Sequence, residues 1–368
     1  MKNDLLTLAF IAPGSVGHTI KWVNGLAEKG VIVTLITQHK VLVDVDNRVK
    51  VIYLPYQGKK GYFLNAFALN RIIKKISPKV INVHYASGYG VLALLSRIKP
   101  YILSVWGSDV YDFPFSSKFN FWLIKKSLLN AGKVASTSHA MADQVQTVLK
   151  PLHCNIAITP FGVDFSKFKK SSEPFSNNVI TIGIVKKLEF IYGVDLLIKA
   201  FAIALNQLSD KDNCKFLKLV IVGEGSLKGE LEALSHELGI SDYVDFVGAV
   251  SNDIVPQYIN KIDVFVVPSR IESFGVAVIE ALGCERPCIV SNTGGLPEVV
   301  EHLKTGLVVD CESESAIAEA ILTLIHNRNM AINMGSSGRK DVLDKYANEY
   351  VIINMIDVYR KFYLNNEQ

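Results

Sequence analysis

The sequence predicts an α/β protein with two doubly wound parallel-sheet domains. Short apolar runs alternate with helical patterns along most of the chain, as in parallel strands whose two faces are both covered by helices. The alternation stops at a polar segment, residues 166–178, which contains Pro174, and then starts again. A chain of 368 residues, 49% of them hydrophobic, is long and apolar enough for two domains of ordinary size.

The first domain, residues 1–168, begins with the run "LLTLAFIA", the loop "PGSVGH" and a helical pattern at residues 19–30. Apolar runs of strand length recur after it, separated by stretches long enough for helices. The strands that we predict occupy residues 5–12, 31–37, 49–55, 80–86, 101–107 and 133–138.

The second domain, residues 179–345, follows a linker that we place at residues 169–178. Helical patterns at residues 194–205 and 226–239 separate its first strands. We expect strands at residues 179–185, 216–225, 244–250, 264–269, 287–292 and 306–310. The last helical stretch, residues 340–363, has no strand after it, and we expect residues 346–368 to cross back to the first domain. Because ligands bind beyond the carboxyl ends of parallel strands, two such domains predict a cleft for two substrates.

Composition excludes several classes of protein. The N-terminal apolar run is short and lacks a small-residue cleavage site, and no window approaches the roughly 18 apolar residues of a spanning helix. We therefore expect a cytoplasmic protein without a membrane span. Cys154, Cys214, Cys284, Cys288 and Cys311 form no CxxC pair or disulfide framework. Cys284 and Cys288 flank the turn "CERPC" but have no further His or Cys near them in sequence, so we expect no metal site.

Charge is distributed unevenly along the chain. Residues 1–150 hold 19 Lys and Arg against 7 Asp and Glu, a net +12, which leaves 20 against 28, or −8, for the remainder. Residues 58–79 and 113–133 interleave Lys and Arg with aromatic and leucine side chains. This pattern fits helices lying on the anionic inner leaflet of a membrane, and equally fits ordinary amphipathic helices packed on the sheet. Nucleic-acid binding is not expected, since no motif for it accompanies the basic residues.

The stretch "SRIESFGVAVIEAL", residues 269–282, carries the chemistry that we expect of the second domain. Glu272 lies in a predicted strand-to-helix loop and Glu280 about 12 Å further along the helix. The amides of Phe274, Gly275 and Val276 lie between them, where a helix N-terminus attracts phosphate. Carboxylates on both sides of a diphosphate suit a nucleotide sugar. The plainer alternative is that Glu272 complements the helix dipole and that Glu280 is solvated.

Residues 267–309, "VPSRIESFGVAVIEALGCERPCIVSNTGGLPEVVEHLKTGLVV", resemble the C-terminal signature of the retaining GT4 glycosyltransferases, with its E-x7-E and GG-x-PE motifs. These enzymes have the GT-B fold, in which two Rossmann-like domains face each other across a cleft. Further similarities are "APGSVGH", "VHYASGYG", "VWGSDV", "TPFGVDFSKF" and the second glycine loop "VIVGEG". The resemblance thus extends over most of the chain, but it does not specify the sugar.

The resemblance implies roles for residues of the second domain. Glu272 would contact donor-sugar hydroxyls, Glu280 the ribose, and the amides that follow Glu272 the phosphates; the nucleotide base would lie near residues 247–250. The family's Arg and Lys that neutralise the diphosphate correspond to Lys187 and Tyr192, so one cation is absent and Lys186 is its candidate substitute. The donor-binding residues that we predict are Gly14, Ser15, Lys186, Lys187, Tyr192, Gly223, Gly225, Glu272, Ser273, Phe274, Gly275, Val276 and Glu280, with Glu272, Lys187 and Asp109 as catalytic residues.

The first domain departs from the family pattern at "WGSD", where Trp106 replaces a histidine often found beside the donor sugar. Asp109 keeps its place, either to bind a hydroxyl or to cap a local turn. His18 and His84 are weaker candidates for the acceptor or sugar side, since a lone histidine beside an apolar strand is usually a core residue. The loop with Gly14 and Ser15 lacks the G-x-G-x-x-G spacing of a dinucleotide site.

The resemblance implies metal-independent, retaining transfer of a hexose-type sugar from a UDP- or GDP-linked donor, without a cofactor. A donor phosphate oxygen would help to deprotonate the acceptor, a saccharide or a polyprenyl-linked saccharide, in cell-surface polysaccharide or glycolipid assembly. The protein would be cytoplasmic, or peripheral on the inner face of the membrane. Three alternatives stay open: a glycosyltransferase-like subunit that binds without catalysing, which Tyr192 favours, a nucleotide-sugar 2-epimerase, and a phosphorylase.

Overall fold

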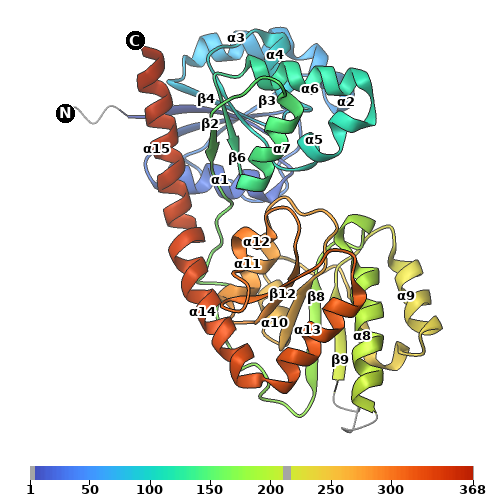
Figure 1. Cartoon of the computed structure of the whole chain (residues 1–368). Coiled ribbons are helices and arrows are strands. Elements are labelled where there is room, and N and C mark those ends of the chain that lie inside the picture. The colour runs from blue at the N-terminus through green and yellow to red at the C-terminus, as the bar shows by residue number, and fades with distance from the viewer. Residues whose placement is uncertain (1–4, 210–216, 368) are drawn as a thin grey trace. The chain divides into compact units, whose positions relative to one another are not determined.

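The structure is a computed structural model, and it describes residues 5–209 and 217–367. The described chain divides into two compact units (Figure 1). The N-terminal unit comprises Met1–Gly162 together with Asn348–Gln368, and the C-terminal unit comprises Val163–Ala347. The last helix therefore belongs to the first unit, and the chain passes between the units twice.

The N-terminal unit is built on a parallel sheet of seven strands in the order β3-β2-β1-β4-β5-β6-β7. Its strands are β1 (Thr7–Ile11), β2 (Ile32–Thr37), β3 (Lys50–Tyr53), β4 (Val80–His84), β5 (Ile102–Ser104), β6 (Lys133–Ser136) and β7 (Ile156–Ile158). Every residue of β4 and β5 is buried, as expected of strands covered on both faces. Each predicted strand of this domain is present. Strand β7, which is only three residues long, was not predicted.

Helices cover both faces of this sheet. They are α1 (Gly17–Glu28), α2 (Gly58–Leu64), α3 (Ala66–Ile76), α4 (Tyr89–Ser96), α5 (Ser108–Tyr111), η1 (Phe113–Ser116), α6 (Lys118–Asn130), α7 (His139–Leu149) and α15 (Asn348–Glu367). Helix α15 packs on α1 and β4. Its buried Tyr359 donates a 2.7 Å hydrogen bond to Asn82 Oδ1 in β4. Gly25 lets α1 approach α15, because a Cβ there would lie 2.9 Å from Ile352 Cδ1.

The C-terminal unit has a parallel sheet of six strands in the order β10-β9-β8-β11-β12-β13. The strands are β8 (Ile180–Val185), β9 (Leu217–Val222), β10 (Val244–Gly248), β11 (Val264–Val267), β12 (Cys288–Ser291) and β13 (Gly306–Val309). All six correspond to predicted strands; the first residue of the predicted 216–225 strand lies outside the described residues. Buried Ile182, Leu219 and Phe201 belong to one apolar core between the sheet and its helices.

The helices of this unit are η2 (Phe190–Tyr192), α8 (Val194–Ser209), α9 (Lys228–Glu237), η4 (Ser241–Tyr243), α10 (Val255–Ile259), α11 (Val276–Gly283), α12 (Leu296–Val299), α13 (Glu314–His326) and α14 (Arg328–Tyr346). Helix α13 packs on α8, and α11 packs on α14. The helical stretch predicted at 340–363 is divided at Ala347, whose extended backbone ends α14 before α15 begins.

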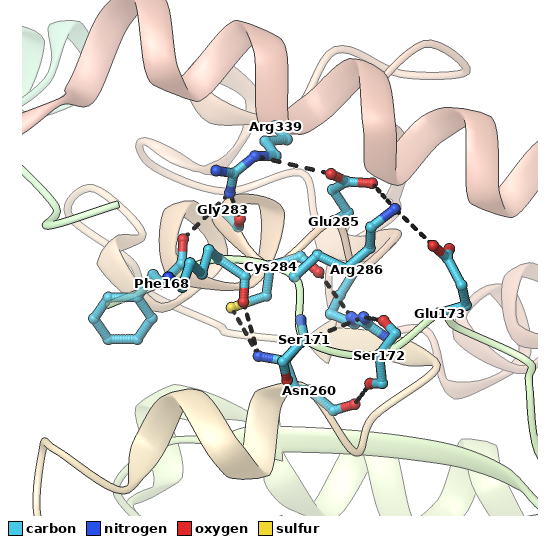
Figure 2. A network of polar contacts seen from close by, with 12 residues as sticks. Phe168, Ser171, Ser172, Glu173, Asn260, Gly283, Cys284, Glu285, Arg286 and Arg339 are labelled. Atoms are coloured by element: carbon cyan, nitrogen blue, oxygen red, sulfur yellow. Dashed lines mark hydrogen bonds and ion pairs between the residues drawn. The ribbon is translucent and has the colours of Figure 1, made fainter. Parts of the chain in front are cut away.

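The segment that we predicted to be a linker, residues 169–178, lies within the C-terminal unit, where polar contacts hold it (Figure 2). Asn260 Oδ1 accepts from the Ser171 amide at 2.8 Å, and its Nδ2 donates to the Lys169 carbonyl at 3.1 Å. The fully buried Arg286 donates to the carbonyls of Ser172 and Cys284. A buried guanidinium needs such acceptors, and here the backbone of the segment supplies one of them.

Candidate functional site

Loops at the carboxyl ends of β8 and β9 contact each other through their backbones. A Cβ on Gly223, whose φ is +147°, would lie 1.9 Å from the Lys186 carbonyl oxygen, and one on Gly225 would lie 2.3 Å from that of Leu188. The Gly223 amide donates to the Gly248 carbonyl at 2.9 Å, next to the segment predicted to hold the nucleotide base. Both predicted glycines are therefore needed for the packing of these loops.

A second pair of glycines fixes the loop that carries Glu272. A Cβ on Gly294, where φ is +50°, would lie 1.7 Å from the Glu272 carbonyl oxygen. The Gly295 amide donates to that same oxygen at 3.1 Å. Phe274 is buried and meets the ring of Tyr346 edge-on, with 5.4 Å between the centroids. The Glu272 backbone is thus held in place from the loop after β12.

Helix α11 begins directly after this loop. Gly275 caps it with φ at +107°, and its carbonyl accepts the first helical hydrogen bonds, from Val278 and Ile279. The amides of Phe274, Gly275 and Val276 lie at the positive end of the helix, where an anion is stabilised. Glu280 lies in the same helix and is half-buried. Of the residues whose amides we predict to bind phosphate, Gly275 is thus the N-cap of α11 and Val276 its first residue.

The cation in contact with Glu272 is Lys186. The Lys186 Nζ lies 2.5 Å from Glu272 Oε2 and 4.5 Å from the centroid of the Tyr192 ring. The side chains of Lys186 and Glu272 are only 14% and 9% exposed, so solvent screens this pair little. Lys187, which occupies the family's Arg position, is exposed and forms no ion pair with any residue that the structure describes. We call Lys186, Tyr192, Glu272 and the N-terminus of α11 the loop site.

The predicted N-terminal residues form an aromatic cluster at the carboxyl edge of their sheet. His84 stacks on Phe10 with centroids 4.1 Å apart and lies 4.6 Å from Trp106. His18 stacks on Phe161 at 4.2 Å and lies 6.4 Å from Trp106. Burial, aided by Lys21, lowers the pKa of His18 to about 4, and burial lowers the pKa of His84 well below its usual value. Both imidazoles are therefore neutral at pH 7.

Asp109 is buried in this unit, and its carboxylate accepts from three backbone amides. Oδ1 accepts from Trp106 at 3.1 Å and Gly107 at 2.9 Å, while Oδ2 accepts from Ala86 at 2.8 Å. Burial raises the pKa of Asp109, and these hydrogen bonds act against the rise. The geometry matches the turn-capping alternative, in which Asp109 joins the loops after β4 and β5 and acts as a positioning residue.

A cavity of about 600 Å³ lies in the N-terminal unit beside the predicted glycine loop. Aromatic side chains line it, among them Tyr62, Tyr89, Phe113 and Phe119, together with Ser15 and His39. The Gly14 amide donates to Thr37 Oγ1 at 2.9 Å, and Thr37 Oγ1 lies 3.1 Å from the Tyr89 hydroxyl. We call this cavity the aromatic pocket. Of its lining, Ser15 was predicted as a site residue and the aromatic side chains were not.

Helices α6, which lines the pocket, and α3 carry exposed apolar and basic side chains. On α6, Lys118, Trp122 and Lys126 are exposed at four-residue spacing, and Phe119 between them is 62% exposed. On α3, the exposed Arg71 guanidinium lies 5.2 Å from the ring of Phe67, which is 73% exposed. Among the described residues, no helix combines the length and the apolar character that crossing a membrane requires.

Two known families match this chain, one in each half. The family described as "Glycosyl transferases group 1" matches residues 165–341, and the family described as "Glycosyl transferase 4-like" matches residues 7–138. The first match includes the whole loop site, and the second includes the glycine loop and the aromatic pocket. The chain belongs to the group 1, GT4-like glycosyltransferases.

Individual glycosyltransferases match this chain over different lengths. A GDP-mannose-dependent α-(1-6)-phosphatidylinositol monomannoside mannosyltransferase of Mycobacterium tuberculosis is 37% identical over 39% of this chain and 39% of its own. The N-acetyl-α-D-glucosaminyl L-malate synthase of Bacillus anthracis is 25% identical over 80% of this chain and 77% of its own. The sucrose-phosphate synthase structure from Thermosynechococcus elongatus superposes with a TM-score of 0.81 at 21% identity, over 98% of this chain and 100% of that one.

The fold class predicted for this glycosyltransferase is confirmed. Each unit is a Rossmann-like parallel sheet with helices, and the last helix belongs to the N-terminal unit, as in the GT-B fold. Within the C-terminal unit the structure brings Lys186, Tyr192 and Glu272 together, and it leaves Lys187 apart from Glu272. Among the described residues, no group of three His, Cys, Asp or Glu side chains is arranged to hold a metal ion.

An ion pair that was not predicted from the sequence supports the loop site of this glycosyltransferase. Arg270 donates to both carboxylate oxygens of Asp195, at 2.8 and 2.7 Å, and to the Phe190 carbonyl at 2.9 Å. The Arg270 amide donates to the Ile191 carbonyl at 2.8 Å. These bonds tie the turn that carries Tyr192 to the loop that carries Glu272. The Arg directly after "VPS" was the available signal, but its partner is 75 residues away.

Proposed function

We propose that this chain is a retaining, metal-independent transferase that moves a hexose-type sugar from a UDP- or GDP-linked donor to a saccharide or lipid-linked saccharide. The observation that carries the proposal is the loop site. A buried glutamate, a cation in contact with it and the N-terminus of an eight-residue helix occur together at the carboxyl edge of the C-terminal sheet. Such an edge is where open parallel sheets bind ligands.

The proposed donor pose follows from the charges of this site. The diphosphate lies at the N-terminus of α11, where backbone amides and the helix dipole favour negative charge. Glu272 accepts hydrogen bonds from sugar hydroxyls, and Glu280 accepts them from the ribose. The nucleotide base lies near residues 247–250, where the Gly248 carbonyl already accepts from Gly223. The GDP-mannose in the name of the mycobacterial relative supports a nucleotide-sugar donor.

Lys186 is the cation that we assign to the leaving group. Negative charge grows on the departing diphosphate, and a fixed cation in a poorly solvated site stabilises it. Lys186 already lies against the ring of Tyr192, the residue that replaces the family's lysine. The Lys186 amine donates a hydrogen bond to Glu272. An incoming diphosphate competes with Glu272 for this amine. Lys187, which is exposed, supplies a second and more distant charge.

Transfer is proposed to occur on the same face of the sugar that the diphosphate leaves. The C1–O bond to the diphosphate breaks, the acceptor oxygen bonds to C1, and the acceptor proton passes to a donor phosphate oxygen. No protein nucleophile is needed. Asp109 and the neutral imidazoles of His18 and His84 do not exchange protons in this scheme.

A donor panel tests the proposal. UDP- and GDP-sugars are screened by thermal shift and slow hydrolysis with wild type, Glu272→Ala and the control Glu301→Ala, whose side chain is 60% exposed on the same unit. We expect one donor to stabilise wild type, and Glu272→Ala to lose about 100-fold in rate, as when a key transition-state contact is removed. Equal rates for Glu272→Ala and wild type would contradict the assigned role of Glu272.

Tyr192 supports a second candidate, a glycosyltransferase-like subunit that binds without catalysing. A tyrosine places no positive charge beside the diphosphate, so this site has fewer cations near the diphosphate than the family motif provides. This candidate predicts that a nucleotide sugar stabilises the protein and that no acceptor or water ever consumes it. If no nucleotide sugar stabilises the protein at all, the transferase proposal fails.

The proposed location is the inner face of a membrane, bound peripherally. The N-terminal half carries a net +12, and exposed Phe67, Phe119 and Trp122 lie among its lysines and arginines. Co-sedimentation with anionic vesicles at low salt tests this, and Lys126→Ala should weaken binding about fivefold, near 1 kcal/mol for one lysine. Lys304→Ala on the other unit is the control. Equal recovery with neutral and anionic vesicles would contradict the proposal.

A further inference from the structure

The hydrogen bonds behind the aromatic pocket determine which atoms carry protons. Thr37 Oγ1 accepts from the Gly14 amide at 2.9 Å and from the His39 amide at 3.1 Å. With both acceptor positions filled, its own hydrogen must be donated. The Tyr89 hydroxyl lies 3.1 Å away, closer than the His39 carbonyl at 3.4 Å. Thr37 is therefore the donor in its contact with Tyr89.

The donor and acceptor roles of the Tyr89 hydroxyl follow in the same way. Its hydroxyl accepts from the Gln38 amide at 3.0 Å and from Thr37. Its single hydrogen is then directed to its remaining neighbour, His39 Nδ1, at 2.8 Å. An imidazole whose Nδ1 accepts a hydrogen bond is neutral and carries its proton on Nε2. Burial also lowers the pKa of His39 and raises that of Tyr89, in agreement with these protonation states.

His39, which lines the pocket, thus has an N–H donor at Nε2. Two further observations indicate what this donor binds. Lys59 also lines the pocket, is exposed, and forms no ion pair with any described residue. Among the described residues of the lining, none is Asp or Glu. A cation and an N–H donor without an opposing carboxylate favour an anionic oxygen, such as that of a phosphate.

The apolar lining of the pocket indicates what kind of group is attached to the anionic oxygen. Phe63 and Phe119 line it and are 54% and 62% exposed, so an apolar surface leads outward from the polar end. A cavity of about 600 Å³ is in the range of sites for drug-sized ligands and is far larger than a phosphate ion requires. A ligand that joins an anionic head to an apolar chain would cover both parts.

We propose that the aromatic pocket binds an amphipathic phosphate ester, whose phosphate accepts from His39 Nε2–H and Lys59 while its apolar chain lies across Phe63 and Phe119. This inference rests on the proposed function in one respect, that the bound phosphate ester is the lipid part of the sugar acceptor. The binding itself needs no donor.

Binding to the full chain is measured by tryptophan fluorescence, since Trp122 stacks on Phe119 at 6.0 Å between centroids. The probes are dioctanoyl phosphatidic acid below its micellar concentration, dioctanoylglycerol and inorganic phosphate. We expect phosphatidic acid to bind at least about tenfold more tightly than either of the other two. Equal binding of dioctanoylglycerol would show a merely apolar pocket, and equal binding of inorganic phosphate a simple anion site. Either result overturns the proposal.

Matched variants test the assigned donors. Lys59→Ala should weaken phosphatidic acid binding about tenfold, as expected for a charge-assisted hydrogen bond, and Lys60→Ala, its exposed neighbour on α2, should not change it. Tyr89→Phe keeps the ring but frees the tautomer of His39, and it should weaken binding about threefold. If buried Tyr89→Phe does not fold, His39→Leu replaces it, with an expected tenfold loss. Unchanged affinity in these pocket variants overturns the proposal.

The donor panel runs in parallel on the same preparations, so that the two proposals fail separately. Stabilisation by a nucleotide sugar without selective phosphatidic acid binding overturns only the inference about the pocket. Selective phosphatidic acid binding without any stabilisation by a nucleotide sugar leaves the pocket assigned and overturns the transferase.

Discussion

The loop site and the aromatic pocket are built from different parts of the chain. In the loop site, backbone meets backbone: Gly223 lies against the Lys186 carbonyl and Gly294 against that of Glu272. In the aromatic pocket, side chains such as Tyr62 and Phe119 make the walls, and they come from separate helices. Close contact between two backbone segments requires glycine at defined positions, whereas a position that lines a pocket can hold any of several apolar side chains. The first kind of site is constrained in sequence, and the second is free to change with its ligand.

The largest expected effect concerns the glycines of the loop site. Gly294→Ala places a Cβ where the Glu272 carbonyl lies and strains a residue with φ at +50°. We expect a loss of about 3 kcal/mol in unfolding free energy of the C-terminal unit. Gly229→Ala in α9, where a Cβ meets nothing within 4 Å, should instead be neutral or slightly stabilising. Chemical denaturation measures both, and similar losses in the two variants would contradict the backbone argument.

The aromatic cluster beside the pocket predicts a pH dependence of stability. The pKa of His18 in the folded protein is about 4, below its value of 6.5 when unfolded, so the unfolded chain binds the proton first. Stability is therefore full above pH 6.5 and falls as the pH is lowered toward 4. At pH 5 the loss from His18 is about 2 kcal/mol.

His18→Phe separates this effect from general acid denaturation, because phenylalanine can stack on Phe161 without titrating. Denaturation curves at pH 7 and pH 5 give the free energies of unfolding of both proteins. The variant should lose about 2 kcal/mol less than wild type over this interval. An identical loss in the two proteins would mean that His18 is readily protonated in the folded state.

A smaller effect distinguishes the two adjacent lysines of the loop site. Lys186→Met should lower the rate of donor turnover about tenfold, since its amine contacts Glu272 and is nearly buried. Lys187→Met, at an exposed residue, should lower it less than about threefold. Both variants carry the same charge change, so each is the control of the other. If Lys187→Met lowered the rate more than Lys186→Met, Lys187 would be the cation that stabilises the diphosphate, as its family position implies. The contact between Lys186 and Glu272 would then have no role in turnover.

The fold was predictable because each buried parallel strand leaves a continuous apolar run. β7 was missed since "IAI" is too short to stand out, and its pairing with β6 forms it. Of the loop site, Glu272, Gly275 and their spacing were evident. The choice between Lys186 and Lys187 was not, because adjacent residues after a strand point to different sides and only the fold shows which side faces Glu272.

Contacts between distant residues were beyond sequence reasoning. The Arg270 and Asp195 pair joins positions 75 residues apart, and Tyr89 reaches His39 across 50. Each of these residues is unremarkable on its own, and a single sequence carries no signal of pairing. Asp109 was visible as a motif residue, but the three amides that occupy its carboxylate come from two loops, and only the folded structure brings them together.

The membership of α15 in the N-terminal unit has a consequence for how the protein is made. Residues Val163–Ala347 form one uninterrupted unit, whereas the N-terminal unit also needs Asn348–Gln368, which are synthesised after the whole of the C-terminal unit. Until then the surfaces of α1 and β4 that α15 covers, including Asn82, lack their partner. The unit whose synthesis starts first is therefore completed last, and a nascent chain must keep that apolar surface from aggregating in the interval.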